Sequence, residues 1–146
     1  MLCPVCSKKH ITGEPLKGIL EVELDGNLSS NNPIDFLPVE NHFFPSIPVG
    51  NTPMWHPKIL SDKIGLKELY FKDDGVNPTG SLKDRASYLV AAFAIKYNVK
   101  EVVVASTGNA GSSMAGVAAA AGLKVKLFLP KTAPPAKMVQ SLQYGA

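Results

Sequence analysis

Lys83 lies where a loop is expected to become a helix, in the segment Asn77-Pro-Thr-Gly-Ser-Leu-Lys-Asp-Arg. Turn-forming pairs break the chain before it, Ser81 is a candidate N-cap, and apolar residues then recur at helical spacing as far as Tyr97. The positive end of the helix dipole disfavours a charged lysine in the first turn, and so does nearby Arg85. A lysine that is easily held as a neutral amine is suited to Schiff-base chemistry. Lys83 is therefore a candidate covalent residue, and the alternative is an ordinary solvated lysine.

A second candidate segment, Ala105-Ser-Thr-Gly-Asn-Ala-Gly-Ser-Ser113, follows a predicted strand at 101–105. A strand, a glycine turn and a helix start together leave backbone N–H groups unpaired, here from Ser106 to Gly111. Such groups can hold a carboxylate or a phosphate without a basic side chain. We therefore predict an anion site at this turn, with Lys83 reachable across the same cleft.

These two segments together resemble the pyridoxal-phosphate enzymes of the tryptophan-synthase-β type fold, and within them the threonine synthase family. Two further stretches match that family in the same order, namely Gly50-Asn-Thr-Pro53 and Leu129-Pro-Lys-Thr-Ala-Pro-Pro-Ala-Lys137 with Tyr144-Gly-Ala146. The likeness covers residues 50–146 well and the first fifty poorly. Leu82 stands where the related motif usually has phenylalanine, a change of packing that should leave the chemistry unaffected.

The resemblance implies that pyridoxal 5'-phosphate is the cofactor and that Lys83 is both its covalent anchor and the residue that later transfers protons. It also implies that Asn109 hydrogen-bonds the phenolic oxygen of the cofactor. The carboxylate of a small amino-acid substrate would be held by hydroxyl and backbone N–H groups of four residues: Ser106, Thr107, Gly108 and Ala110. Asp84 and Arg85 are interpreted as structural, Asp84 because it favours the helix dipole and Arg85 because it can pair with a carboxylate outside this segment.

The implied reaction is that of threonine synthase, which converts O-phosphohomoserine and water into threonine and phosphate. The alternatives are a threonine or serine dehydratase, a cysteine-synthase-like β-replacement enzyme, or a non-catalytic fragment of the same fold. The sequence holds no Gly-Gly-Gly run that would serve as the phosphate cradle of the cofactor. The resemblance further implies a homodimer of the full-length enzyme.

From Glu68 onward, strands and helices are predicted to alternate. The pattern gives strands at 69–73, 101–105 and 124–129 and helices at 82–97, 109–121 and from about Pro135. Alternation with short connections is typical of an α/β fold with a parallel sheet and helices on both faces. We assign residues 50–146 to the N-terminal part of a catalytic domain.

Residues 1–49 are predicted to form an irregular arm with one strand at Ile19–Leu24 and a proline-rich loop after it. Cys3 and Cys6 form half of a zinc knuckle, but a structural zinc needs four ligands, so we predict no metal site. A zinc site completed elsewhere, a redox dithiol and a simple local turn are the competing interpretations. Phe43-Phe44 is expected to make a core or subunit contact.

The composition is that of an ordinary globular domain, with 146 residues, 45% hydrophobic and 18% charged. A net charge of +3 with scattered lysines argues against nucleic acid as a partner. The apolar runs are broken by lysine, asparagine or glycine, so we expect no membrane span, and the cytoplasm is the expected location.

Overall fold

A computed structural model of the chain describes residues 2–26 and 29–146. The chain divides into two compact units, Met1–Pro38 and Val39–Ala146. Each unit is described by itself. The domain boundary that we place at residue 50 stays a prediction.

The first unit is irregular. It contains two short 3-10 helices, Ser7–Lys9 and Pro33–Phe36, and a single antiparallel bridge between Leu2 and Ile19. The predicted strand Ile19–Leu24 is therefore wrong, because beyond Ile19 it finds no partner strand among the described residues and its apolar side chains lie exposed. Part of the loop that follows, Asn27 and Leu28, lies outside the described residues.

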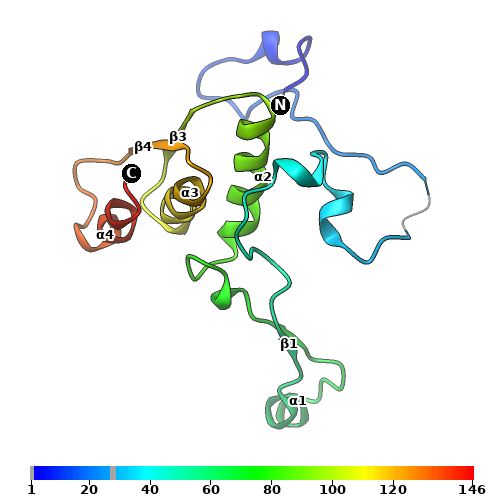
Figure 1. The fold of residues 1–146 in the computed structure, drawn as a ribbon. Coiled ribbons are helices and arrows are strands. Elements are labelled where there is room, and N and C mark those ends of the chain that lie inside the picture. Colours follow the sequence, from blue (N-terminus) through cyan, green and yellow to red (C-terminus); the bar gives the residue numbers. More distant parts are fainter. Residues whose placement is uncertain (1, 27–28) are drawn as a thin grey trace. The chain divides into compact units, whose positions relative to one another are not determined.

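The second unit contains a parallel pair of strands, β3 (Glu101–Ala105) and β4 (Lys124–Phe128), in continuous register from Glu101↔Lys124 to Ala105↔Phe128. The helix α3 (Asn109–Ala120) connects them, as Figure 1 shows. The predicted strand at 101–105 is confirmed residue for residue, and the other two elements differ from their predictions only near their ends. Valines on one face of the strands pack against a buried cluster formed by α3 and its neighbour α2 (Lys83–Lys96).

The predicted strand at 69–73 does not join this parallel sheet. Only Phe71–Lys72 (β2) is extended, and it pairs antiparallel with β1 (Met54–Trp55) in a separate two-stranded sheet. The turn at Gly50–Pro53 favours this pairing, since the Asp73 N–H donates to the Pro53 carbonyl at 2.9 Å and the Lys72 amine donates to the Thr52 carbonyl. A short helix, α1 (Lys58–Ile64), lies in the connection between the two strands.

The buried face of α2 differs from the one that its large apolar residues predict. Leu82, Val90 and Tyr97 are 46–60% exposed, whereas the buried positions are Asp84, Ser87 and three alanines. The reason is that α2 packs closely against α3, whose buried residues are also mostly small. Two helices can approach closely only where small side chains meet, so the contact selects the alanine and serine face.

The helix α4 (Ala136–Gln143) packs beside α3 and confirms the helix predicted from about Pro135. One face of the β3–β4 pair carries the helices, while Val103 and Phe128 on the other face are each 62% exposed. Within the described residues, helices therefore cover only one face of this sheet. No helix in the described part of the chain is both long and apolar enough to cross a membrane.

The predicted contact of Phe43-Phe44 is made inside this unit. The Phe44 ring lies 4.8 Å from the ring of Tyr88 on α2, and the Lys96 amine lies 5.9 Å from the centre of the Phe43 ring. Both aromatic rings thus pack against α2, in agreement with the core alternative.

Candidate active site

Lys83 is the first residue of α2, and it is exposed. Its backbone N–H donates to the Ser81 hydroxyl at 3.1 Å, and the Asp84 N–H donates to the Ser81 carbonyl at 3.2 Å. The N-cap of α2 is Leu82, one residue after the predicted Ser81, but the Ser81 hydroxyl still satisfies an otherwise orphan donor of the first turn. The result is a lysine presented to solvent from a fixed backbone position.

The loop before Lys83 is held by two buried polar side chains. The carboxylate of Asp84 is fully buried and accepts hydrogen bonds from the backbone N–H of Thr79, at 2.7 Å, and from its hydroxyl. The amide of Asn77 donates to the carbonyls of Asp74 and Ser81 and accepts from the Gly50 N–H at 2.9 Å. Asp84 is therefore a structural residue, in agreement with the sequence interpretation.

Arg85 forms a two-pronged ion pair with Asp74. Its Nε and Nη2 atoms lie 2.7 Å from the two carboxylate oxygens, and Thr52 bridges the pair through its hydroxyl. The guanidinium holds the pKa of Asp74 far below the usual range of a carboxyl, and the Asp74 carboxylate in turn raises the pKa of Arg85. Because Asp74 balances the charge of Arg85, the repulsion of Lys83 by Arg85 is weaker than the sequence suggests.

The turn between β3 and α3 has the predicted geometry, but not all of its N–H groups are free. The Gly108 N–H donates to the Ser106 hydroxyl at 3.2 Å, and the Gly111 N–H donates to the Gly108 carbonyl at 2.9 Å. Within residues 2–26 and 29–146, no acceptor pairs with the backbone N–H groups of Ser106, Thr107, Asn109 and Ala110. The anion site thus has four free donors, fewer than the whole run from Ser106 to Gly111.

Gly111 allows this turn to close. A Cβ atom at this position would lie 2.8 Å from the Ser106 carbonyl oxygen and 3.0 Å from the Leu127 side chain. Any larger residue would therefore push the start of α3 away from β3 and β4.

A pocket of about 170 Å³ opens at this turn. Its lining residues come from the turn itself and from two helices, and they are Thr107, Gly108, Asn109, Ser112, Ala136 and Gln140. The pocket follows the carboxyl end of β3, where a parallel sheet is expected to bind its ligand. Three of the predicted site residues therefore share one pocket, while Ser106 and Ala110 flank it in the chain and Lys83 does not line it.

Two polar contacts join the elements that carry this pocket to the elements that carry Lys83. The hydroxyls of Ser87 and Ser113 are buried and lie 2.7 Å apart. Lys83 precedes Ser87 by one helical turn and Asn109 precedes Ser113 by one helical turn, so each lies about 6 Å along its helix from this contact. The second contact is made by Gln140, whose amide Nε2 donates to the Thr79 carbonyl at 3.2 Å.

Gln140, Ser112 and Ala136 are the pocket residues that sequence reasoning missed. Gln140 and Ala136 lie on α4, and no periodicity or turn signal indicates that this helix reaches the α3 turn. The two family matches near the end of the sequence were the available pointers to this region, because the stretch 129–137 contains Ala136 and the stretch 144–146 contains Tyr144, which contacts Gln140 at 3.4 Å.

The residues present fit pyridoxal 5'-phosphate in part. An exposed amine for its aldehyde stands at the start of α2, and the exposed Asn109 amide stands at a pocket beside free backbone donors. A glycine-rich cradle for the phosphate of the cofactor is not found in the sequence. The chain thus supplies the covalent and ring-orienting groups, together with an anion site.

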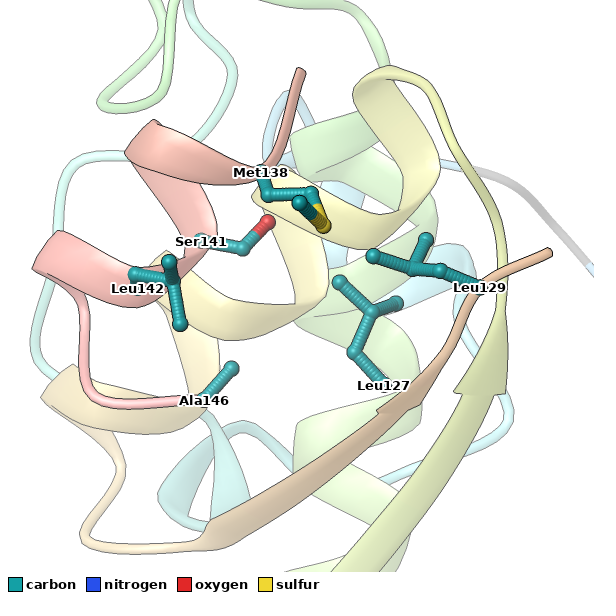
Figure 2. Close-up of a pocket in the computed structure, with 6 residues that line it drawn as sticks. All are labelled: Leu127, Leu129, Met138, Ser141, Leu142 and Ala146. Carbon is teal, nitrogen blue, oxygen red and sulfur yellow. The ribbon is translucent and has the colours of Figure 1, made fainter. Parts of the chain in front are cut away.

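A second pocket, of about 100 Å³, lies between β4 and α4 (Figure 2). Leu127 and Leu129 face α4, where Met138 and Leu142 lie opposite them. No titratable side chain lines it. Its lining is mainly apolar, and the hydroxyl of the buried Ser141 is its polar side-chain group.

The cysteine pair forms a local turn in the first unit. The Cys6 N–H donates to the Cys3 sulfur at 3.5 Å, and this bond lowers the pKa of the Cys3 thiol below its usual value. Among the described residues, no group of three or more histidine, cysteine or acidic side chains is placed to hold a metal ion. The choice among a zinc site, a redox dithiol and a simple turn stays open.

Comparison with known proteins agrees with this geometry. The family model described as "Pyridoxal-phosphate dependent enzyme" matches residues 46–146. The chain therefore belongs to the pyridoxal-phosphate dependent enzymes, which confirms the predicted fold and, at the level of the family, the predicted cofactor.

Within that family, the chain is similar to threonine synthases. It is 40% identical over 111 residues to the threonine synthase of Methanosarcina acetivorans, a match that covers 75% of this chain and 27% of that protein. It is 37% identical over 115 residues to the threonine synthase of Methanocaldococcus jannaschii, covering 77% and 28% respectively. The chain thus spans less than a third of the length of these relatives.

A solved structure with the same fold is that of a pyridoxal 5'-phosphate-dependent aspartate racemase. It matches with a TM-score of 0.58 and 32% sequence identity, over 65% of this chain and 31% of that one.

Proposed function

We propose that this protein acts as a threonine synthase, in which Lys83 holds pyridoxal 5'-phosphate and the α3 turn holds the substrate. The observation that carries the proposal is the pocket at Thr107, Gly108 and Asn109, whose lining residue Gln140 contacts the segment that presents Lys83. A hydroxyl contact between Ser87 and Ser113 also joins the two helices that start at Lys83 and at Asn109. The similarity to threonine synthases supports the choice of reaction.

The amine of Lys83 would bind the aldehyde carbon of the cofactor. When bound, the cofactor supplies a sink for the electron pair that is released when a bond to the substrate Cα breaks. The Asn109 amide would donate a hydrogen bond to the phenolic oxygen of the ring and keep it in one orientation. When its amine is not bound to the cofactor, Lys83 would take a proton from one substrate carbon and return it to another.

The substrate carboxylate would lie at the start of α3. The unpaired backbone N–H groups of Thr107, Asn109 and Ala110 can bind an anion, and no basic side chain is needed for this. The positive end of the helix dipole also favours negative charge at this place. The hydroxyls of Ser106 and Thr107 would add donors, and Gly108 would let the ligand approach the backbone. This arrangement positions the amino group toward the cofactor.

The proposed reaction starts from O-phosphohomoserine. Proton removal at Cα and then at Cβ allows the Cγ–O bond to break, and inorganic phosphate leaves with the electron pair of that bond. A water molecule then adds its hydroxyl at Cβ, and the carbon skeleton regains protons at Cα and Cγ to give threonine. Lys83 would carry these protons, because a lysine amine can both form the covalent bond to the cofactor and act as a base.

The test has two stages. The full gene product is mixed with pyridoxal 5'-phosphate, reduced with borohydride and digested, and mass spectrometry should find the adduct on the peptide that contains Lys83. The unreduced enzyme is then given O-phosphohomoserine, and it should release phosphate and threonine in equal amounts. An adduct without phosphate release would keep the family chemistry and reject the synthase reaction.

The same full gene product is also tested with the substrates of the other reactions of the family. Formation of 2-oxobutyrate from threonine would indicate a dehydratase, and a thioether product from an activated serine would indicate a β-replacement enzyme. The similarity to the aspartate racemase favours a further candidate, an amino-acid racemase, which would interconvert L- and D-aspartate. No adduct at all would support a non-catalytic module.

We also propose, from the family resemblance, that the full-length enzyme is a homodimer. Light scattering coupled to size-exclusion chromatography should give twice the mass of one chain. A monomer at micromolar concentration would contradict this.

A further inference from the structure

Gln140 is a polar residue that both lines the α3 pocket and contacts the loop before Lys83. Its Nε2 atom lies 3.2 Å from the Thr79 carbonyl oxygen and 3.4 Å from the Tyr144 hydroxyl. It faces the pocket together with Thr107 and Asn109, which belong to the predicted anion site. Gln140 is therefore a candidate ligand-binding residue.

The chemistry of its partners determines which way the amide is turned. A backbone carbonyl only accepts hydrogen bonds, so the atom next to Thr79 must be the Nε2 donor. The second hydrogen of Nε2 is then directed to the Tyr144 oxygen. The amide is thus held at two points, and Oε1 is left as its acceptor.

The Oε1 atom of Gln140 can still accept a hydrogen bond. In the part of the chain that the structure describes, no donor pairs with it, and no buried side-chain oxygen or nitrogen is left without a partner. Oε1 is therefore accessible to a ligand or to water. The pocket is thus lined on one side by residues with free N–H donors at the start of α3, and on the other by Gln140 of α4, whose amide retains an unpaired acceptor.

We propose that Gln140 is a substrate-binding residue whose Oε1 accepts a hydrogen bond from the ammonium group of the incoming amino acid, before that amine binds the cofactor, or from the hydroxyl group of the threonine product. The proposal rests on the proposed function, in which the carboxylate of the same molecule lies at the start of α3. An amino acid carries an acceptor group and a donor group, and this pocket offers the complement of each. The pocket then selects amino acids over simple carboxylic acids of the same length.

Two ligands with the same carbon skeleton distinguish binding of the carboxylate at the start of α3 from binding of the donor group at Gln140. L-Threonine carries a carboxylate, an ammonium and a hydroxyl, whereas butyrate carries only the carboxylate. Each is titrated into the ¹⁵N-labelled chain, and binding is followed at the amide signals of Thr107, Asn109 and Ala110. Threonine should bind the unmodified chain more tightly than butyrate does.

Three variants test the role of the side chain. Gln140→Met keeps the length and removes the amide, so it should weaken threonine about fivefold, the loss expected for one hydrogen bond, and change butyrate less than twofold. Gln140→Glu keeps an acceptor and adds a charge, so the preference for threonine over butyrate should be retained or increased. Gln143→Met is the matched control, since Gln143 is exposed on the same helix and should change neither affinity.

The outcomes separate this inference from the proposed function. Equal affinity of threonine for the unmodified chain and for Gln140→Met, or an equal loss for both ligands, overturns the role of Gln140 and leaves the carboxylate site intact. If neither ligand moves the three amide signals of the unmodified chain, the carboxylate site itself is wrong, and the inference falls with it. Should Gln140→Met fail to fold, Gln140→Glu decides alone, because loss of its preference for threonine also contradicts the proposal.

Discussion

The buried carboxylate of Asp84 accepts hydrogen bonds from both the backbone N–H and the hydroxyl of Thr79. The Thr79 carbonyl also accepts a hydrogen bond from Gln140. The Thr79 methyl group packs against Gly116, where an added Cβ atom would lie only 2.5 Å from that methyl carbon. One threonine thus connects the first turn of α2, the middle of α3 and the pocket residue of α4. The position of Lys83 depends on this connection, because Asp84 is its neighbour in the chain.

Asp84→Ala should destabilise the protein by about 1–3 kcal/mol, because it leaves the buried N–H and hydroxyl of Thr79 without an acceptor. Asp84→Asn keeps one acceptor and should lose less. Urea denaturation followed by circular dichroism measures both free energies of unfolding. Equal losses for the two variants would indicate that the charge, and not the hydrogen bonding, is what Asp84 contributes.

Stability should depend on pH through Asp74. Its pKa is lowered in the folded state by Arg85, so the folded protein binds fewer protons than the unfolded chain, whose aspartate has a pKa of about 3.9. The contribution is therefore complete above that value and is lost as the pH falls below it. Asp74→Asn should unfold more easily at pH 6 and show a flatter dependence between about pH 5 and pH 2. The same slope in both proteins would assign acid sensitivity to other carboxylates.

Lys83→Ala should abolish both the reducible adduct with pyridoxal 5'-phosphate and turnover, since no other group supplies the covalent amine. Lys72→Ala is the control, because the Lys72 amine already donates to the Thr52 carbonyl. The adduct is measured by mass spectrometry after reduction with borohydride. An adduct that persists in Lys83→Ala and disappears in Lys72→Ala would exchange the two roles.

Asn109→Ala should reduce turnover by about 10²-fold while the fold is retained, because the ring of the cofactor loses a positioned hydrogen bond. Asn109 is exposed and starts α3 without a side-chain capping bond, so little stability should be lost. The absorption spectrum of the bound cofactor and the steady-state rate are the two measurements. Unchanged kinetics would leave Asn109 as a turn residue.

Gly116→Ala should destabilise the protein by about 1–3 kcal/mol, because the added methyl would overlap the Thr79 side chain at 2.5 Å and crowd Tyr144 at 3.2 Å. Ala119→Ser, at an exposed position of the same helix, should stay within about 0.5 kcal/mol of the unmodified protein. Thermal unfolding provides both values. If Gly116→Ala left the stability unchanged, the loop at Thr79 would be able to shift without a cost in free energy.

Local patterns predicted much of this chain correctly. The strand at 101–105, the helix that starts at Asn109 and the lysine at the head of α2 follow from features that act over a few residues, namely β-branched runs, glycine turns and helix caps. The motifs around Lys83 and Asn109 also indicated the family before any coordinates, because their chemistry depends on backbone positions that the adjacent residues specify.

Contacts between distant residues were decided only by the tertiary structure. The partner of β2 is β1, and the small face of α2 is buried in place of its larger apolar residues. Asp74 neutralises Arg85, which also donates a hydrogen bond to the Thr52 hydroxyl. Gln140 enters the pocket from a helix that no local pattern connects with Asn109. Such pairings depend on which surfaces fit most closely once several elements pack together. The residues adjacent to a side chain in the sequence do not specify which distant residues it will contact.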